Sequence, residues 1–67
     1  MAVNYGLNKV RFPAPVPAGS RVRLTASLAA AEELKGDGVQ ATIDAVMQLE
    51  GGDKPVCVAQ MVHRYYP

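Results

Sequence analysis

The segment from Gly38 to Glu50, GVQATIDAVMQLE, decides the fold. Apolar residues alternate along it with polar ones: one parity holds Val39, Ala41, Ile43, Ala45, Met47 and Leu49, and the other holds Gln40, Thr42, Asp44, Gln48 and Glu50. Only Val46 interrupts the alternation. A period of two over so long a segment predicts a β-strand with one apolar face and one face toward water.

The sequence before this segment predicts the strand that pairs with it. Gly36-Asp37-Gly38 is typical of a hairpin turn, so we predict a hairpin that pairs residues 21–35 with residues 39–50. Residues 29–35 are rich in helix formers, and a short helix there is the alternative, with Ser27 as its N-cap. We favour the strand because an isolated helix of two turns is only marginally stable. A bulge around residues 29–31 would absorb the slip in alternation.

The remaining segments predict two further strands. Gly51-Gly52-Asp53 predicts a second turn, and Pro55 then begins a last strand that is apolar on both faces, which favours a central place in the sheet. Residues 3–12 predict a leading strand, with a bulge near Asn8 and a close backbone approach at Gly6.

The expected fold is all-β. Prolines at 13, 15 and 17 predict an extended connection after the leading strand. A meander of residues 20–35, 38–50 and 54–66 joins the leading strand in a four-stranded antiparallel sheet. No segment is long enough to form a helix that would cover this sheet.

The chain has 67 residues, which we expect to form a single domain, 1–67. It holds three Tyr, one Phe and no Trp, and its single cysteine, Cys57, can form no disulfide within the chain. A lone sheet of this composition buries little apolar surface. We therefore expect self-association.

The net charge of +1 gives no general attraction to nucleic acids or membranes. Residues 1–30 nevertheless hold Lys9, Arg11, Arg21 and Arg23 and no acid, whereas all six acids lie within residues 31–53. This asymmetry can steer an anionic ligand or dock one subunit on another. The alternative is a chance segregation of charge on solvated strand faces. Four basic residues without a basic overall charge argue against nucleic acid as a partner.

No apolar run reaches the length of a signal peptide or a membrane span. One unpaired thiol suits a reducing compartment. We therefore expect a cytoplasmic protein that makes no membrane contact.

The sequence offers little for metal or nucleophilic chemistry. Cys57 and His63 are the only residues of their types, and we predict that they point to opposite faces of the last strand. Cys57 is expected to be a small buried hydrophobic residue and His63 a surface residue or one with satisfied hydrogen bonds. We therefore expect no metal site and no cofactor.

Two segments carry a resemblance to a known family, namely NYGLNKVRFPAPVPAGSRVR at residues 4–23 and KPVCVAQMVHRYY at residues 54–66. The most specific part is Gly6–Val16, and Lys54–Ala59 adds to it. Together with the long hairpin, these segments closely resemble the C-terminal half of MaoC-like dehydratases, the hot-dog-fold (R)-specific enoyl-CoA hydratases. The resemblance covers essentially the whole chain.

The resemblance implies a longer complete domain, in which the sheet wraps around a central helix. A loop before that helix would hold an Asp/His pair that activates water for addition across the double bond of an acyl-CoA thioester. This chain lacks the Asp/His spacing, and His63 is its sole histidine. The resemblance therefore carries over no catalytic residue.

The resemblance also implies where a ligand would lie. In the family, the proline-rich strand exit that matches Arg11–Val16 borders the acyl-CoA cleft. This makes Lys9, Arg11, Phe12 and Arg21 candidate ligand contacts, and the alternative for each is a solvent-facing side chain.

Three functions are compatible with these observations. The favoured one is a non-catalytic homo-oligomer, first a dimer and second a tetramer, whose sheets close into a sandwich or barrel and bind an acyl-CoA-like or hydrophobic ligand between subunits. The second is a fragment that completes an enoyl-CoA hydratase in trans with a partner. The third is a structural or nucleic-acid interaction module.

Overall fold

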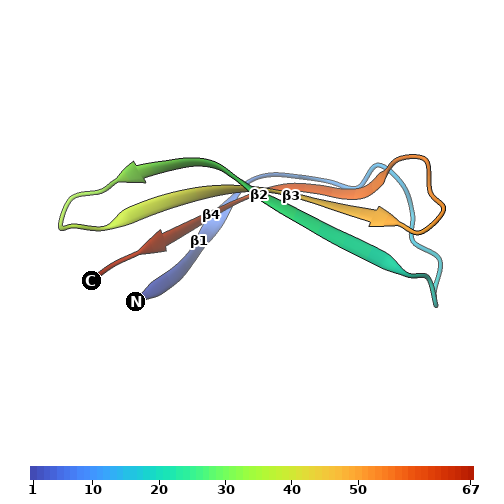
Figure 1. Cartoon of the computed structure of the whole chain (residues 1–67), viewed down its shortest axis with the longest axis horizontal. Helices are drawn as coiled ribbons and strands as arrows, with labels where there is room; N and C mark the ends of the chain where they lie inside the picture. Colours follow the sequence, from blue (N-terminus) through green and yellow to red (C-terminus); the bar gives the residue numbers. More distant parts are fainter.

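The computed structural model describes residues 1–67 and contains four strands and no helix. The strands are β1 (Ala2–Arg11), β2 (Val22–Glu33), β3 (Val39–Leu49) and β4 (Pro55–Tyr65). They form one antiparallel sheet in the order β1-β4-β3-β2, which places β4 and β3 in the centre (Figure 1). The predicted antiparallel sheet and the central place of the last strand are confirmed. The choice of strand over helix is also confirmed for residues 29–33.

Both predicted turns are present and have the backbone geometry that their residues favour. Gly36 and Asp37 have φ angles of 78° and 63°, in the left-handed region that Gly and Asp tolerate best. The Leu34 N–H donates to the Gly38 carbonyl at 2.8 Å and closes this hairpin. In the second turn, Gly51 has a φ of 77°.

The predicted bulges lie where the alternation of the sequence slips. β2 shifts its register against β3 between Leu28 and Ala30, and β1 shifts against β4 between Leu7 and Lys9. A further shift between Asn4 and Gly6 was not predicted. The prediction of a close backbone approach at Gly6 is wrong, because a Cβ built there would meet nothing within 4 Å. The close approach is instead at Gly38, where a Cβ would lie 3.0 Å from Cδ1 of Tyr66.

The register assigns each side chain to one of two faces, because directly paired residues of an antiparallel sheet share a face. The apolar face consists of Val22, Leu24, Ala26, Leu28, Ala31 and Glu33 of β2; Val39, Ala41, Ile43, Ala45, Met47 and Leu49 of β3; Cys57, Ala59, Met61, His63 and Tyr65 of β4; and Ala2, Asn4, Leu7 and Val10 of β1. The polar face consists of Arg23, Thr25, Ser27, Ala30 and Glu32 of β2; Gln40, Thr42, Asp44, Val46 and Gln48 of β3; Pro55, Val58, Gln60, Val62 and Arg64 of β4; and Val3, Gly6, Lys9 and Arg11 of β1.

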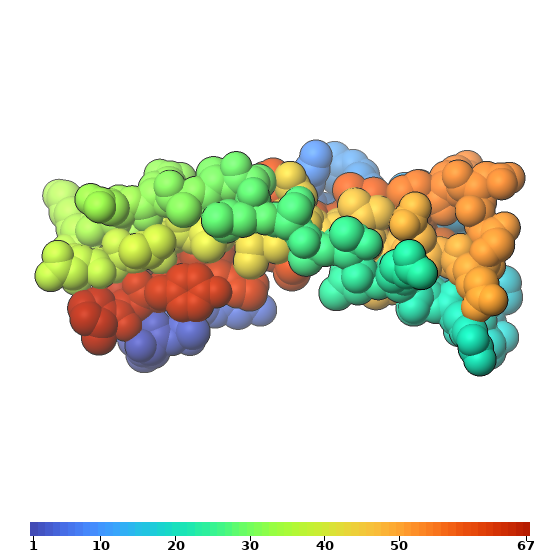
Figure 2. All heavy atoms as spheres, in the orientation of Figure 1, coloured from blue at the N-terminus to red at the C-terminus, as the bar shows by residue number.

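The sheet forms a single layer with almost no core. Its buried apolar residues are only Ala41, Ala45, Val56 and Val62. The molecule measures 45 × 18 × 15 Å, and its radius of gyration is 14.6 Å (Figure 2). A compact domain of this length would have a radius of gyration of about 11 Å. The chain therefore leaves most of its apolar side chains without cover.

Candidate functional site

The side chains of the apolar face form rows across the strands. Leu28, Ile43, Met61 and Leu7 make one row of large side chains. The neighbouring row is made of small side chains, Ala26, Ala45, Ala59 and Val10. Beyond it, Leu24 and Met47 are large again. Because a row of small side chains lies between rows of large ones, the surface of this face is uneven. Apolar groups of a ligand or another protein element can fit against it.

The large side chains of this face are highly exposed on the two edge strands, β1 and β2. Leu24 is 59% exposed, Leu28 65% and Leu7 58%. Contiguous exposed apolar patches of this kind mark interaction surfaces, because monomeric proteins rarely leave them open to water. The face is therefore a candidate interaction surface.

Two polar side chains stand among the apolar ones. Asn4 pairs directly with His63, which in turn pairs with Ala41, so both lie in one row of the apolar face. The imidazole is half-buried, and its ring centroid lies 6.5 Å from that of Tyr65. An amide and an imidazole on this face can donate hydrogen bonds to a bound molecule or accept them from it.

The sequence did not reveal the pairing of Asn4 with His63. It depends on the register of β1 on β4, which includes the unpredicted shift between Asn4 and Gly6. No local pattern marks that shift, since the alternation of residues 3–7 is regular.

The prediction that Cys57 and His63 lie on opposite faces is wrong. They are an even number of residues apart, and their partners Met47 and Ala41 both lie on the apolar face. Six residues of extended strand nevertheless separate them by about 20 Å, so the thiol and the imidazole cannot act together. No group of three or more His, Cys, Asp or Glu side chains is arranged to hold a metal ion.

The structure separates the predicted ligand contacts. Lys9 and Arg11 lie on β1, and Phe12, 75% exposed, follows directly. Arg21 precedes β2 at the opposite edge of the sheet. Three strand spacings, about 14 Å, lie between these edges. The four residues therefore do not form one compact cluster.

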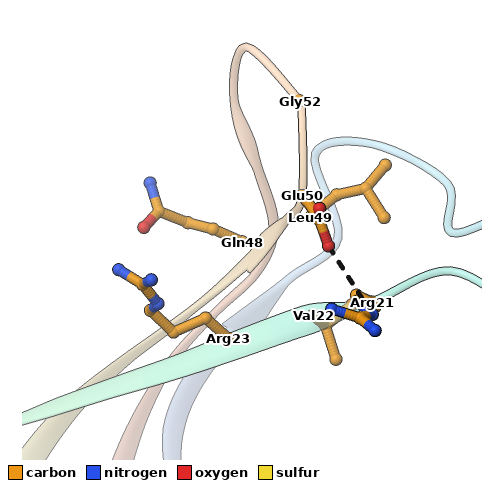
Figure 3. Close-up of a pocket in the computed structure, with 7 residues that line it drawn as sticks. All are labelled: Arg21, Val22, Arg23, Gln48, Leu49, Glu50 and Gly52. Atoms are coloured by element: carbon orange, nitrogen blue, oxygen red, sulfur yellow. Dashed lines mark ion pairs between the residues drawn. The ribbon is translucent and has the colours of Figure 1, made fainter.

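Arg21 does border a surface pocket of about 510 Å³ at the end of the sheet, lined by Arg21, Val22, Arg23, Gln48, Leu49, Glu50 and Gly52 (Figure 3). Within it, Nε of Arg21 lies 3.9 Å from Oε2 of Glu50, and the two side chains are 87% and 69% exposed. Such an exposed pair contributes little to stability, because water screens the charges.

The polar face is occupied by a network of side chains. Asn8 Nδ2 donates to Gln60 Oε1 at 2.9 Å, and Gln60 Nε2 donates to Asp44 Oδ1 at 2.9 Å. A second chain runs from Arg64 Nε to Gln40 Oε1 at 2.9 Å. The Arg64 guanidinium also lies 3.7 Å from the centroid of the Tyr5 ring. These side chains therefore find hydrogen-bond and cation–π partners among one another.

The structure has no helix with the length and hydrophobicity needed to span a membrane. No protein-family model matches the chain.

Individual proteins do match it. The chain is 58% identical over 65 residues to 3-hydroxyacyl-thioester dehydratase Z of Mycobacterium tuberculosis H37Rv, which covers 97% of this chain and 43% of that protein. The Mycobacterium bovis protein of the same name gives the same values. Nodulation protein N of Rhizobium leguminosarum bv. viciae is 32% identical over 62 residues, covering 92% of this chain and 38% of that protein.

The chain thus spans less than half the length of the curated relatives that it matches. The match nevertheless extends over nearly all of this chain, and the all-β antiparallel sheet agrees with half of a hot-dog fold. The resemblance is therefore confirmed: this chain is homologous to part of a MaoC-like dehydratase.

Proposed function

We propose that this chain is the sheet half of a hot-dog protein that binds acyl thioesters such as acyl-CoA, and that it has no acid–base pair of its own. In this proposal, the apolar faces of two or more copies cover one another, and the acyl chain lies between them. The observation that carries the proposal is the exposure of large apolar side chains of this face on the edge strands β1 and β2. The 58% identity to a protein named for 3-hydroxyacyl thioesters supports the choice of ligand.

The chemistry of the apolar face suits such a ligand. An acyl chain gains free energy by burying its methylene groups, at about 0.8 kcal/mol for each one. The rows of large and small side chains offer it apolar contact along the sheet. His63 and Asn4 place hydrogen-bonding groups on the same face, where they can contact the thioester carbonyl.

The same face lacks what dehydration requires. Removing water from a 3-hydroxyacyl thioester, or adding it to an enoyl thioester, needs a positioned general base and acid. The carboxylate of Asp44 lies on the polar face and accepts a hydrogen bond from Gln60. Glu33 shares the apolar face with His63 but is two strands away and two residues further along the sheet, a distance of about 12 Å. His63 therefore has no carboxylate partner.

Titration of the purified protein with octanoyl-CoA and with free CoA tests the proposal. We expect calorimetric binding of octanoyl-CoA, weaker binding of CoA, and no hydration of crotonyl-CoA by the protein alone. Leu28→Glu should abolish octanoyl-CoA binding, because it places a charge on the apolar face. Thr25→Glu, on the polar face of the same strand, is the matched control and should bind normally.

Two outcomes would overturn the proposal. Equal binding to the two variants would show that the apolar face is not the site. Turnover of crotonyl-CoA by the isolated chain would show that its own residues supply the acid–base chemistry.

A second candidate function is completion of a dehydratase in trans. It is favoured by the coverage, since 57% of the mycobacterial relative has no counterpart in this chain (100% minus the 43% that is covered). Mixing this chain with a polypeptide that corresponds to the remainder of that relative should then produce crotonyl-CoA hydration that neither component shows. Inactivity of a mixture that forms a stable complex would argue against this function.

A further inference from the structure

The first strand, β1, does not alternate as its sequence suggests. Asn4 and Leu7 are three positions apart, so a regular strand would direct them to opposite faces. In the structure both lie on the apolar face, with Leu7 opposite Met61. Two residues at this spacing can share a face only where the strand contains one extra residue. The register shift between Asn4 and Gly6 supplies it, and Tyr5 is the residue without a partner on β4.

The extra residue is held on the polar face by a cation–π contact. The Arg64 guanidinium lies 3.7 Å from the centroid of the Tyr5 ring, and Arg64 Nε donates to Gln40 Oε1 at 2.9 Å. Arg64 is half-buried and belongs to no ion pair within the chain. Cation–π contacts are strongest where the cation is partly removed from water. The contact therefore fixes Tyr5 at the bulge.

A second polar-face contact depends on the same bulge. Asn8 Nδ2 donates to Gln60 Oε1 at 2.9 Å, and Gln60 lies on the polar face. In a regular strand that kept Asn4 opposite His63, Asn8 would lie opposite Ala59 on the apolar face. The hydrogen bond with Gln60 could not form from there. It therefore supports the bulged register of β1 from the other side of Tyr5.

We propose that Tyr5 and Arg64 are positioning residues whose contact locks the bulge of β1. The lock keeps Asn4 and Leu7 on the apolar face together. Without the bulge, both halves of β1 would share one register with β4, and either Asn4 or Leu7 would turn to the polar face. The lock involves only β1 and β4, which pair within this chain.

The consequence of the lock for ligand binding rests on the proposed function. There, Asn4 offers a hydrogen bond to the thioester carbonyl, and Leu7 belongs to the row of large side chains that contacts the acyl chain. The bulge lets one short strand supply both kinds of contact to the same face. Tyr5 and Arg64 would thus act on the ligand through the residues that they position, and not by touching it.

Cross-strand contacts measured by NMR test the lock without a ligand. In the wild type, we expect nuclear Overhauser contacts between residues 4 and 63 and between residues 7 and 61, because directly paired residues lie about 4.5–5.5 Å apart. Tyr5→Leu keeps a large side chain but removes the ring, and Arg64→Met removes the cation. Each should lose one of the two contacts. Contacts between Leu28 and Ile43 report whether the rest of the sheet is folded.

Two control variants separate the lock from a general loss of stability. Tyr5→Phe keeps the ring and should keep both contacts. Val3→Ala shortens a side chain of the same strand and face, opposite Arg64, and should also keep both. If Tyr5→Leu unfolds the sheet, Arg64→Met decides. Persistence of both contacts without the ring or without the cation, or loss of either contact in Tyr5→Phe, would overturn the proposal.

Titration with octanoyl-CoA tests the consequence for the ligand. Tyr5→Leu should raise the dissociation constant about tenfold, as expected for the loss of one hydrogen bond or one apolar contact. Tyr5→Phe should bind as the wild type does. Unchanged affinity in a Tyr5→Leu protein with an altered register would overturn the role of the lock in ligand binding. Absence of binding by the wild type would contradict the proposed function and leave the register lock standing.

Discussion

On the polar face of the sheet, side chains form hydrogen bonds across the strands, whereas on the apolar face the large side chains of the edge strand β2 are exposed. Gln60 links Asn8 to Asp44, and Arg64 is held between Gln40 and the Tyr5 ring. On the opposite face, Leu24 and Leu28 are more than half exposed. On the polar face, the side chains find hydrogen-bond partners within the chain. Interactions with other molecules are therefore to be sought on the apolar face.

Adjacent residues of β3 give the strongest test of this comparison. Ile43 lies on the apolar face and Thr42 on the polar face. If the apolar face is covered in solution, Ile43→Asp buries a charge in place of an apolar side chain. The expected loss in the free energy of unfolding is roughly 3 kcal/mol or more, with dissociation to monomer. Thr42→Asp should cost less than about 1 kcal/mol and keep the wild-type mass.

Light scattering after gel filtration and denaturant unfolding measure both quantities. An Ile43→Asp protein that keeps the mass and stability of the wild type would show that the apolar face remains open to water.

A substitution of His63, one of the polar residues on the apolar face, gives the next largest expected effect. His63→Leu removes the imidazole from a face that otherwise stays apolar, so assembly should be unchanged. Affinity for octanoyl-CoA should fall about tenfold if the imidazole bonds the thioester carbonyl, which is a typical loss for one hydrogen bond. Cys57→Ala, on the same face and strand, is the control and should bind normally in the same titration. Unchanged affinity of the His63→Leu variant would remove His63 from the site.

The hydrogen-bonded network on the polar face predicts a smaller effect, namely a loss of stability without a change in mass. Gln60→Ala breaks two hydrogen bonds and should lower the free energy of unfolding by about 1 kcal/mol without changing the mass. Gln48→Ala changes an exposed residue of the same face and should be close to neutral. Thermal unfolding followed by circular dichroism can resolve this difference. Dissociation of the Gln60→Ala assembly would place an intermolecular contact on the polar face.

Much of the fold could be predicted because it is encoded locally. The alternation of residues 39–49 defines two faces, and Gly36-Asp37-Gly38 defines the hairpin that aligns β2 with β3. The slip at residues 29–31 was visible as a break in the pattern and is a bulge in the structure. These features depend on residues that are close in sequence.

The site depends on residues that are distant in sequence, and it was predicted less well. Asn4 pairs with His63 only because β1 and β4 pair in a shifted register, and no turn connects these two strands. For the same reason, the strand order separates Lys9 and Arg11 from Arg21, although all three belong to one basic part of the sequence. Their contact with a ligand stays a prediction.

The smallest expected effect concerns the basic end of the sheet. Arg21→Ala removes an ion pair between side chains that are 87% and 69% exposed, so the free energy of unfolding should change by less than about 0.5 kcal/mol. An effect on ligand affinity would have a different cause, because Arg21 also borders the pocket at this end. If the phosphates of CoA lie there, Arg21→Ala weakens octanoyl-CoA binding at low salt, and the difference from wild type shrinks as salt screens the charge. Lys35→Ala, in the turn at the other end of the sheet, controls for net charge. Equal losses for both variants would mean that the charge of the whole chain attracts the ligand and that Arg21 is not a contact.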